Sequence, residues 1–239
     1  MEQTRPVVFV LTDGSGRGNP SRLPATTRVL ERTGATRGSV YGRFTDGAVY
    51  RALLSRDLAT FTNVASDLAA ALLDERIEDV VADAAEGYNP SHDICRYLAN
   101  AAAEIAGRSS ARPIASYEFD LVAPPAAAPG PSAADGTVVL TLDDDALSRK
   151  IDAARAYTEM AAEVDAALAA WGPSAFRHEL LRSVAPHGGW RDPAELPPAY
   201  ERHGERRLAD GAYADVIRFT DHVRPLRDAL RACAGAVSA

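Results

Sequence analysis

Lysine, cysteine and long apolar runs are scarce in this sequence, and these scarcities limit the chemistry, the cross-links and the membrane segments that the protein can have. Lys150 is the single lysine among 26 basic residues, so a lysine Schiff base has one candidate. Cys95 and Cys233 are the two cysteines, which excludes a disulfide framework and a four-cysteine zinc site. No apolar run reaches about 18 residues, so no membrane span is expected. Met1–Pro6 lacks a basic-then-apolar signal pattern, and we expect a cytoplasmic protein.

The composition is that of an ordinary folded domain. The chain has 239 residues, of which 46% are hydrophobic and 25% charged, and this excludes a mainly disordered protein. The 33 acidic residues outnumber the 26 basic ones and leave a net charge of −7, spread along the chain. A dedicated nucleic-acid binder, or a protein held on anionic lipid, normally shows the opposite balance. We therefore expect no nucleic acid and no membrane, but a polar small molecule, as the partner.

Strand and helix patterns alternate in the first half of the chain, which predicts an α/β fold with a mostly parallel sheet and helices on both faces. The predicted strands are Val7–Leu11, Asp79–Asp83 and Ile114–Val122. The predicted helices are Pro24–Thr33 with a stop at Gly34, Leu53–Leu73 with an interruption near Ser55–Asp57, and Ser91–Ala106.

The second half begins after a segment rich in proline and alanine, 123–136, which is typical of a linker or exposed loop. We expect one domain overall, with an α/β core at 1–122 and strands and helices at 137–239 that pack on it, forming a helical C-terminal extension. The predicted elements there are strands Val138–Leu142 and Asp215–Phe219 and helices Ala146–Trp171, Ser174–Val184 and His222–Cys233.

The first candidate site is the glycine-rich loop that follows the opening strand. Its glycines let backbone N–H groups approach an oxygen-rich ligand, although the spacing matches no phosphate-binding motif. Asp13 lies at the strand end as a candidate catalytic or hydroxyl-binding group. Ser15, Arg17 and Arg22 are candidate substrate-binding residues, because a guanidinium can hold a carboxylate or phosphate. The alternative is a tight turn with solvated arginines.

The second candidate site is the polar loop after the strand Asp79–Asp83. His92 lies near a helix N-terminus, where the helix dipole favours the neutral ring, so it is a candidate base or metal ligand. Glu86 is a candidate acid/base, and Tyr88, Asn89 and Arg96 are candidate substrate-binding residues. Asp93 is assigned to the helix dipole, and the alternative for the histidine is a helix cap or a core residue. Both loops follow strand ends, so we expect them to face each other across one cleft.

Several short motifs together resemble the LmbE/PIG-L family, in the same order along the chain. They are Thr12-Asp13-Gly14, Arg28-Val29-Leu30-Glu31 before Gly34, Asp79-Val80-Val81 leading to Asn89-Pro90-Ser91-His92, Leu147–Tyr157 and Phe176-Arg177-His178-Glu179. The resemblance implies a Rossmann-like α/β fold. It also implies the chemistry of metal-dependent deacetylases that act on N-acetylglucosaminyl groups.

The sequence departs from that family at the metal site. The family opens with Ala-His-Pro-Asp-Asp-Glu, which supplies two metal ligands and the catalytic base, and this sequence contains no counterpart. The family's His-Pro-Asp-His becomes Asn89-Pro90-Ser91-His92, so one family ligand remains, at His92. Catalytic zinc needs about three protein ligands. The cofactor is therefore either absent or a divalent metal, zinc, bound at a site that Asp13, Glu86, Asp83 or another histidine rebuilds with His92.

Three functional interpretations follow. The first is a deacetylase-like hydrolase that cleaves an amide or ester of a polar, sugar-like compound, with His92, Glu86 and Asp13 as catalytic residues; the resemblance to the family implies a role in small-molecule biosynthesis. The second is a metal-free enzyme that uses Glu86 and His92 for proton transfer on the same scaffold. The third is a non-catalytic binding protein. Loss of the family's first strand would expose an edge of the sheet. We expect either the C-terminal segment or a second subunit of a homo-oligomer to cover that edge.

Overall fold

The computed structural model describes residues 5–16, 18–122, 136–184 and 188–236, which form two compact units. Unit 1 combines Met1–Thr45 with Ala123–Arg182, and unit 2 combines Asp46–Val122 with Ser183–Ala239. The predicted linker lies almost entirely outside the described residues, and the single-domain organisation stays a prediction. Within the described ranges, no helix is both long and apolar enough to cross a membrane.

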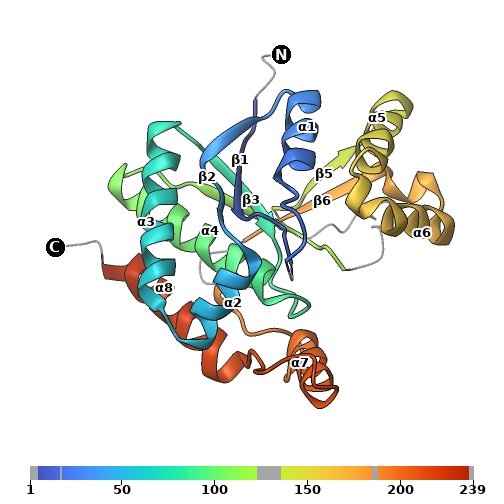
Figure 1. Cartoon of the computed structure of the whole chain (residues 1–239). Coiled ribbons are helices and arrows are strands. Elements are labelled where there is room, and N and C mark those ends of the chain that lie inside the picture. Colours follow the sequence, from blue (N-terminus) through green and yellow to red (C-terminus); the bar gives the residue numbers. More distant parts are fainter. Residues whose placement is uncertain (1–4, 17, 123–135, 185–187, 237–239) are drawn as a thin grey trace. The chain divides into compact units, whose positions relative to one another are not determined.

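Unit 1 begins with the predicted strand and helix. The β-branched run forms β1 (Val7–Thr12), and α1 (Leu23–Thr33) follows with a proline in its first turn. The helix ends at Gly34, whose φ of 72° is the left-handed conformation that closes a helix. β1 pairs in parallel with β2 (Thr36–Phe44), and Figure 1 shows α1 beside this pair.

The strand β2 was absent from the sequence-based expectations, because Gly38 and Gly42 interrupt its apolar pattern. The packing explains both glycines. A Cβ atom at Gly38 would overlap the ring of Phe9, and one at Gly42 would overlap the side chain of Leu23. The residues that weaken the strand pattern are therefore those that let its neighbours approach closely.

The rest of unit 1 corrects two helix predictions. The expected helix Ala146–Trp171 is divided into α5 (Asp144–Arg155) and α6 (Ala161–Trp171) with a short 3₁₀ turn between them. Tyr157 lies at this break, outside both helices, and its hydroxyl group is 3.2 Å from Oγ1 of Thr26. That tertiary contact holds the tyrosine in a non-helical conformation.

The expected helix Ser174–Val184 is wrong. A 3₁₀ turn, Pro173–Arg177, precedes a strand, β6 (His178–Ser183), which pairs antiparallel with β5 (Val138–Thr141). The single lysine, Lys150, donates to the carbonyl of Phe176 at 3.0 Å and forms an ion pair with Glu179. It therefore joins α5 to β6.

Unit 2 is built around three packed helices, α3 (Leu58–Asp74), α4 (Pro90–Ser109) and α8 (Arg224–Ala236), which Figure 1 shows side by side. Their apolar residues form its core. The most deeply buried, each at most 1% exposed, include Phe61, Val64, Ile94, Tyr97, Leu226 and Leu230. The predicted interruption before α3 is confirmed: α2 (Asp46–Leu54) ends there, and Asp57 caps α3 by accepting the N–H of Thr60 at 3.2 Å.

Two strands of unit 2, β3 (Asp79–Asp83) and β4 (Ala115–Phe119), pair in parallel as predicted. The expected strand Asp215–Phe219 is wrong. The N–H of Phe219 donates to the buried Glu201 carboxylate at 2.9 Å, and that of Arg218 donates to His222 Nδ1 at 2.8 Å. A π-helical turn, Phe219–Val223, then leads into α8. Side chains thus take the backbone donors that a neighbouring strand would need. Unit 2 also contains α7 (Ala199–Ala209).

The fold class is accordingly α/β with mixed strand pairing and a large share of helix. The parallel pairs β1–β2 and β3–β4 agree with the expected topology. The antiparallel pair β5–β6 corrects the prediction of a mostly parallel sheet. Strand β6 lies where the sequence predicted a helix, so the sequence analysis could not foresee its antiparallel pairing with β5.

Candidate functional site

The candidate site in unit 2 is formed where the chain passes from β3 into α4. β3 ends at Asp83, and the N–H of Ala84 donates to the carbonyl of Phe119 at 2.9 Å, which fixes the strand end beside β4. α4 begins after Asn89, whose Oδ1 accepts the N–H of Ser91 at 2.9 Å. Asn89, a predicted substrate-binding residue, is therefore the N-cap of the helix. The loop between these two fixed points brings the first turn of α4 back to the strand end.

His92 and Asp83 meet at this point through a hydrogen bond between Nδ1 of the ring and Oδ2 of the carboxylate. A carboxylate accepts, so Nδ1 carries the proton and Nε2 has the free lone pair. Within the described part of the chain, Nε2 has no protein partner. The His92 side chain is 44% exposed and that of Asp83 is 21% exposed, so solvent and small molecules can reach the ring.

The hydrogen bond to Asp83 raises the pKa of His92 above its usual value near 6.5, while partial burial opposes this effect. The negative charges of Asp93 and Glu86 add smaller contributions in the same direction. The imidazolium form is therefore stabilised beside Asp83. Such a ring can take a proton at Nε2 and hold the resulting charge, which is what a general base requires.

Glu86, predicted as a second acid/base, is bound to the backbone that follows β4. Its carboxylate accepts the N–H of Leu121 at 2.8 Å and that of Val122 at 3.3 Å. These bonds tie the β3–α4 loop to the end of β4. A catalytic role for Glu86 stays a prediction.

Asp93 does more than face the helix dipole, the role expected from its position in the first turn. It is only 1% exposed, and its Oδ1 accepts the N–H of Gly87 at 3.1 Å, so it clamps the loop onto α4. Burial raises the pKa of its carboxyl group to about 7. Its Oδ2 is buried and has no hydrogen-bond partner among the described residues. The Tyr200 hydroxyl is likewise buried without such a partner.

The remaining residues of this loop and helix are split between the surface and the core. Tyr88 is 60% exposed beside the N-cap. Arg96 is completely buried, donates from Nη1 to the carbonyl of Tyr117 at 2.7 Å and from Nη2 to Ser116 at 2.8 Å, and so links α4 to β4. Substrate contacts by Tyr88 and Arg96 stay predictions. Burial raises the pKa of the neighbouring Cys95 thiol to about 12, which disfavours its thiolate form.

The candidate loop in unit 1 is held together by Asp13. Its Oδ1 accepts the N–H of Ser15 at 3.0 Å and the Ser15 hydroxyl at 2.6 Å, and its carbonyl accepts the N–H of Arg22 at 2.8 Å. Gly14 supports this turn with a φ of 69°. Within the described residues, the Arg22 guanidinium makes no hydrogen bond or ion pair. Arg17 lies outside the described residues, and the cleft expected between the two loops stays a prediction.

Comparisons with known proteins give one informative match. No protein-family model matches the chain, and no curated protein matches it in sequence. Among solved structures, the chain is similar to one described as "The crystal structure of antimicrobial reagent A40926 pseudoaglycone deacetylase Dbv21". The likeness is one of fold. The two chains share 19% identity, the match covers 75% of this chain and 84% of the other, and the TM-score is 0.50.

The zinc that the sequence resemblance implies was tested against the donors of the candidate site. Among the described residues, no group of three or more His, Cys, Asp and Glu side chains is placed to hold a metal ion. His92 keeps Nε2 free as one possible ligand, since its Nδ1–Asp83 bond is the kind that metal-binding histidines make, whereas Glu86 is committed to backbone N–H groups. These residues therefore do not fit a catalytic zinc, which needs about three protein ligands and an open position.

The sequence analysis gave only minor roles to two residues of this site. Asp83 was considered only as an alternative metal ligand, and Asp93 only as a helix-dipole partner. A carboxylate at a strand end, followed by a polar loop and a histidine in the next helical turn, is the signal that could have paired Asp83 with His92. Nothing in the spacing marks Asp93 as buried, because its 1% exposure depends on tertiary packing.

Proposed function

We propose that the protein is a deacetylase-like hydrolase that removes an acyl group from a polar, sugar-like small molecule by cleaving an amide or ester bond. The observation that carries the proposal is the Asp83–His92 pair, with its accessible ring and free Nε2, at the end of β3. The fold likeness to a solved deacetylase and the motif ending in His92 support the same reaction class.

In the proposed reaction, His92 Nε2 accepts a proton from a water molecule as the water oxygen attacks the acyl carbon. Asp83 keeps the Nδ1 proton in place and stabilises the imidazolium that forms. The tetrahedral intermediate then breaks its bond to the leaving nitrogen or oxygen, and that atom takes the proton from Nε2. The products are a carboxylic acid and an amine or alcohol, and the ring returns to its neutral form.

For substrate binding, we assign the leading role to Tyr88 in unit 2, and binding by Arg22 of unit 1 stays a prediction. The exposed ring of Tyr88 offers an apolar face and a hydroxyl group, a combination that suits a sugar ring. Arg22 has a guanidinium without a partner among the described residues, and it can hold a carboxylate or phosphate of the substrate. Asp13, Ser15 and Glu86 are assigned to holding the two loops, because their oxygens bind neighbouring backbone and hydroxyl groups.

A specific observation favours a second candidate, a non-catalytic binding protein. The two groups expected to assist His92 as acid/base or metal ligand both accept hydrogen bonds from the protein: Glu86 from the backbone after β4, and Asp13 from its own loop. Without a second acid/base beside His92, the site has fewer groups to assist bond cleavage, and this favours recognition of a ligand over its hydrolysis.

The test is release of acetate from a panel of N-acetyl and O-acetyl amino sugars by the whole protein and by His92→Gln. General-base catalysis contributes roughly a hundredfold or more, so this variant should lose at least that much turnover. His203→Gln is the matched control, because His203 is an exposed residue of α7 and should leave the rate unchanged.

The outcomes separate the candidates. Equal turnover by wild-type protein and His92→Gln would refute the proposed reaction. Saturable sugar binding without any acetate release would favour the binding protein. Loss of activity on adding a chelator, with recovery on adding zinc, would show that a bound metal rather than His92 activates the water.

A further inference from the structure

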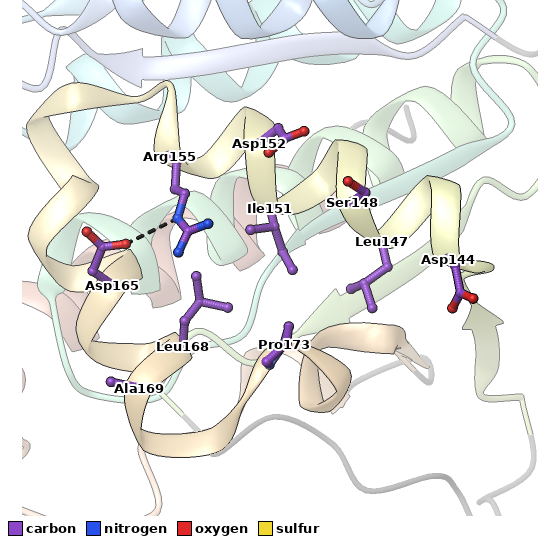
Figure 2. Close-up of a pocket in the computed structure, with 10 residues that line it drawn as sticks. All are labelled: Asp144, Leu147, Ser148, Ile151, Asp152, Arg155, Asp165, Leu168, Ala169 and Pro173. Carbon is purple, nitrogen blue, oxygen red and sulfur yellow. Dashed lines mark hydrogen bonds and ion pairs between the residues drawn. The ribbon is translucent and has the colours of Figure 1, made fainter.

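A groove of about 870 Å³ lies between α5 and α6 in unit 1, and its lining contains none of the residues assigned to the proposed reaction. Its floor is apolar, and Figure 2 shows Leu147 and Ile151 of α5 pointing toward Leu168 of α6 and Pro173. Among the described residues, its polar lining includes the carboxylates of Asp144, Asp152 and Asp165 and one cation, Arg155. The groove therefore combines an apolar floor with an acidic lining.

The helix α6 is mostly apolar in composition, but it is not buried against other described parts of the protein. All of its residues except Glu163 and Asp165 are apolar, yet none of them is buried among the described residues. Only Leu147 is buried in α5. A helix that is apolar on nearly every side normally lies in a core or against another surface. The α5–α6 face is thus an apolar surface on which a further element can pack.

The charges around the groove determine which element fits. The acidic residues of the segment 143–165 are Asp143, Asp144, Asp145, Asp152, Glu159, Glu163 and Asp165, and its basic residues are Arg149, Lys150 and Arg155. Arg155 pairs with Asp165 at 3.2 Å, and Asp144 pairs with Arg177 at 2.6 Å. Within the described residues, Asp152 has no side-chain partner. The surface around the groove keeps an excess of negative charge after its own pairs are made.

From the apolar floor and the acidic surroundings we infer that the α5–α6 groove binds the apolar face of a basic amphipathic helix from a partner protein. Apolar side chains spaced three and four residues apart would occupy the space above Ile151, Leu168 and Pro173. Lysine or arginine side chains flanking that face would reach Asp152 and its acidic neighbours. The carboxylates would add attraction for the right partner and repel an acidic helix.

Trp171 makes the binding measurable, because it ends α6 two residues before Pro173 and is 50% exposed, whereas Trp190 is 6% exposed. The probe is a synthetic amphipathic helix of leucine and lysine, about four turns long and free of tryptophan. Titrated into the full chain, it should give a saturable change in Trp171 fluorescence that weakens in high salt. The same peptide with glutamate in place of lysine should not bind.

Two charge variants locate the site. Asp152→Lys should weaken binding about tenfold, because it reverses the unpaired charge beside the groove. Asp74→Lys is the matched control, since Asp74 is an exposed residue at the end of α3 in unit 2, and it should bind like wild type. Leu168→Ser tests the apolar floor, with circular dichroism as a check on folding, and it should also weaken binding.

The proposal is overturned by any of four results: no saturable signal, equal binding of the glutamate peptide, equal effects of Asp152→Lys and Asp74→Lys, or a signal that persists in Trp171→Phe. The last result would place the peptide elsewhere on this acidic chain. None of these measurements uses the hydrolase activity, so the groove and the proposed reaction succeed or fail independently.

Discussion

Asp83, the last residue of β3, accepts a hydrogen bond from Nδ1 of His92 in the first turn of α4 and so fixes which ring nitrogen faces outward. A histidine without this partner would populate both tautomers and rotate about its side-chain bonds. The pairing therefore turns an ordinary surface histidine into an oriented base. The strand end and the helix start supply one residue each, so the geometry depends on the loop that connects them.

Asp83→Asn should lower kcat by about a hundredfold or more while leaving KM nearly unchanged, because the amide stabilises the wrong tautomer and cannot offset the imidazolium charge. Steady-state kinetics on the best acetylated sugar of the panel would measure both constants. Asp79→Asn, at the exposed opposite end of the same strand, is the control and should have no effect. A large rise in KM with unchanged kcat would instead assign Asp83 to substrate binding.

The rate of the wild-type enzyme should rise with pH as His92 loses its proton, because only the neutral ring can act as base. The bond to Asp83 raises the His92 pKa, so the midpoint of this rise should lie above 6.5. In Asp83→Asn the largest cause of the shift is gone, and the ring pKa, followed by NMR, should fall. A wild-type midpoint at or below 6.5, or a ring pKa that is the same in both proteins, would contradict this assignment.

Local sequence signals predicted the elements that local interactions determine. The run Val7–Leu11, the stop at Gly34 and the break near Asp57 were all found, because β-branching, a left-handed glycine and a side-chain cap act within a few residues. His92 was also placed near the helix start from its neighbours alone. These features need no knowledge of the distant parts of the chain.

Elements that depend on distant partners were missed or mistaken. Strand β6 requires β5, some 40 residues earlier, and β2 requires side chains that fill the space above Gly38 and Gly42. The substrate-binding role of Arg96, predicted from its charge, stays a prediction, but its complete burial and its bonds to β4 had no local signature. The Asp83–His92 pair likewise depends on how the strand end and helix meet, which the spacing alone did not determine.

Arg96→Met should destabilise the protein by about 3 kcal/mol, because it removes donors from the Tyr117 carbonyl and the Ser116 hydroxyl inside the fold. Urea denaturation followed by circular dichroism would measure the change. Arg112→Met is the comparison: it breaks an exposed ion pair with Glu78 and should cost less than about 1 kcal/mol. Equal effects would mean that the Arg96 bonds contribute no more than a surface pair.

The free energy of unfolding should fall as pH rises from about 4 to 7, because buried Asp93 keeps its proton in the folded state after the unfolded chain has lost it. The folded pKa is about 7 and the usual value is 3.8, so the stabilisation is complete below 3.8 and lost through 7. Asp93→Asn cannot ionise and should be about 2 kcal/mol more stable than wild type at pH 8. Parallel pH profiles for the two proteins would show that Asp93 ionises normally.

Gly87→Ala should cost about 3 kcal/mol and should also reduce turnover, because Gly87 holds the loop between Asp83 and His92. Its φ of 69° disfavours any side chain, and an added Cβ would lie 2.9 Å from Pro198 and 3.0 Å from Pro193. Gly211 has the same φ of 69° with nothing within 4 Å, so Gly211→Ala measures the backbone strain alone, about 1 kcal/mol. Thermal unfolding of both variants separates strain from crowding. If both variants lose the same stability, Pro193 and Pro198 move aside at no cost in free energy. The loop would then be held by the Asp93 hydrogen bond rather than by its packing.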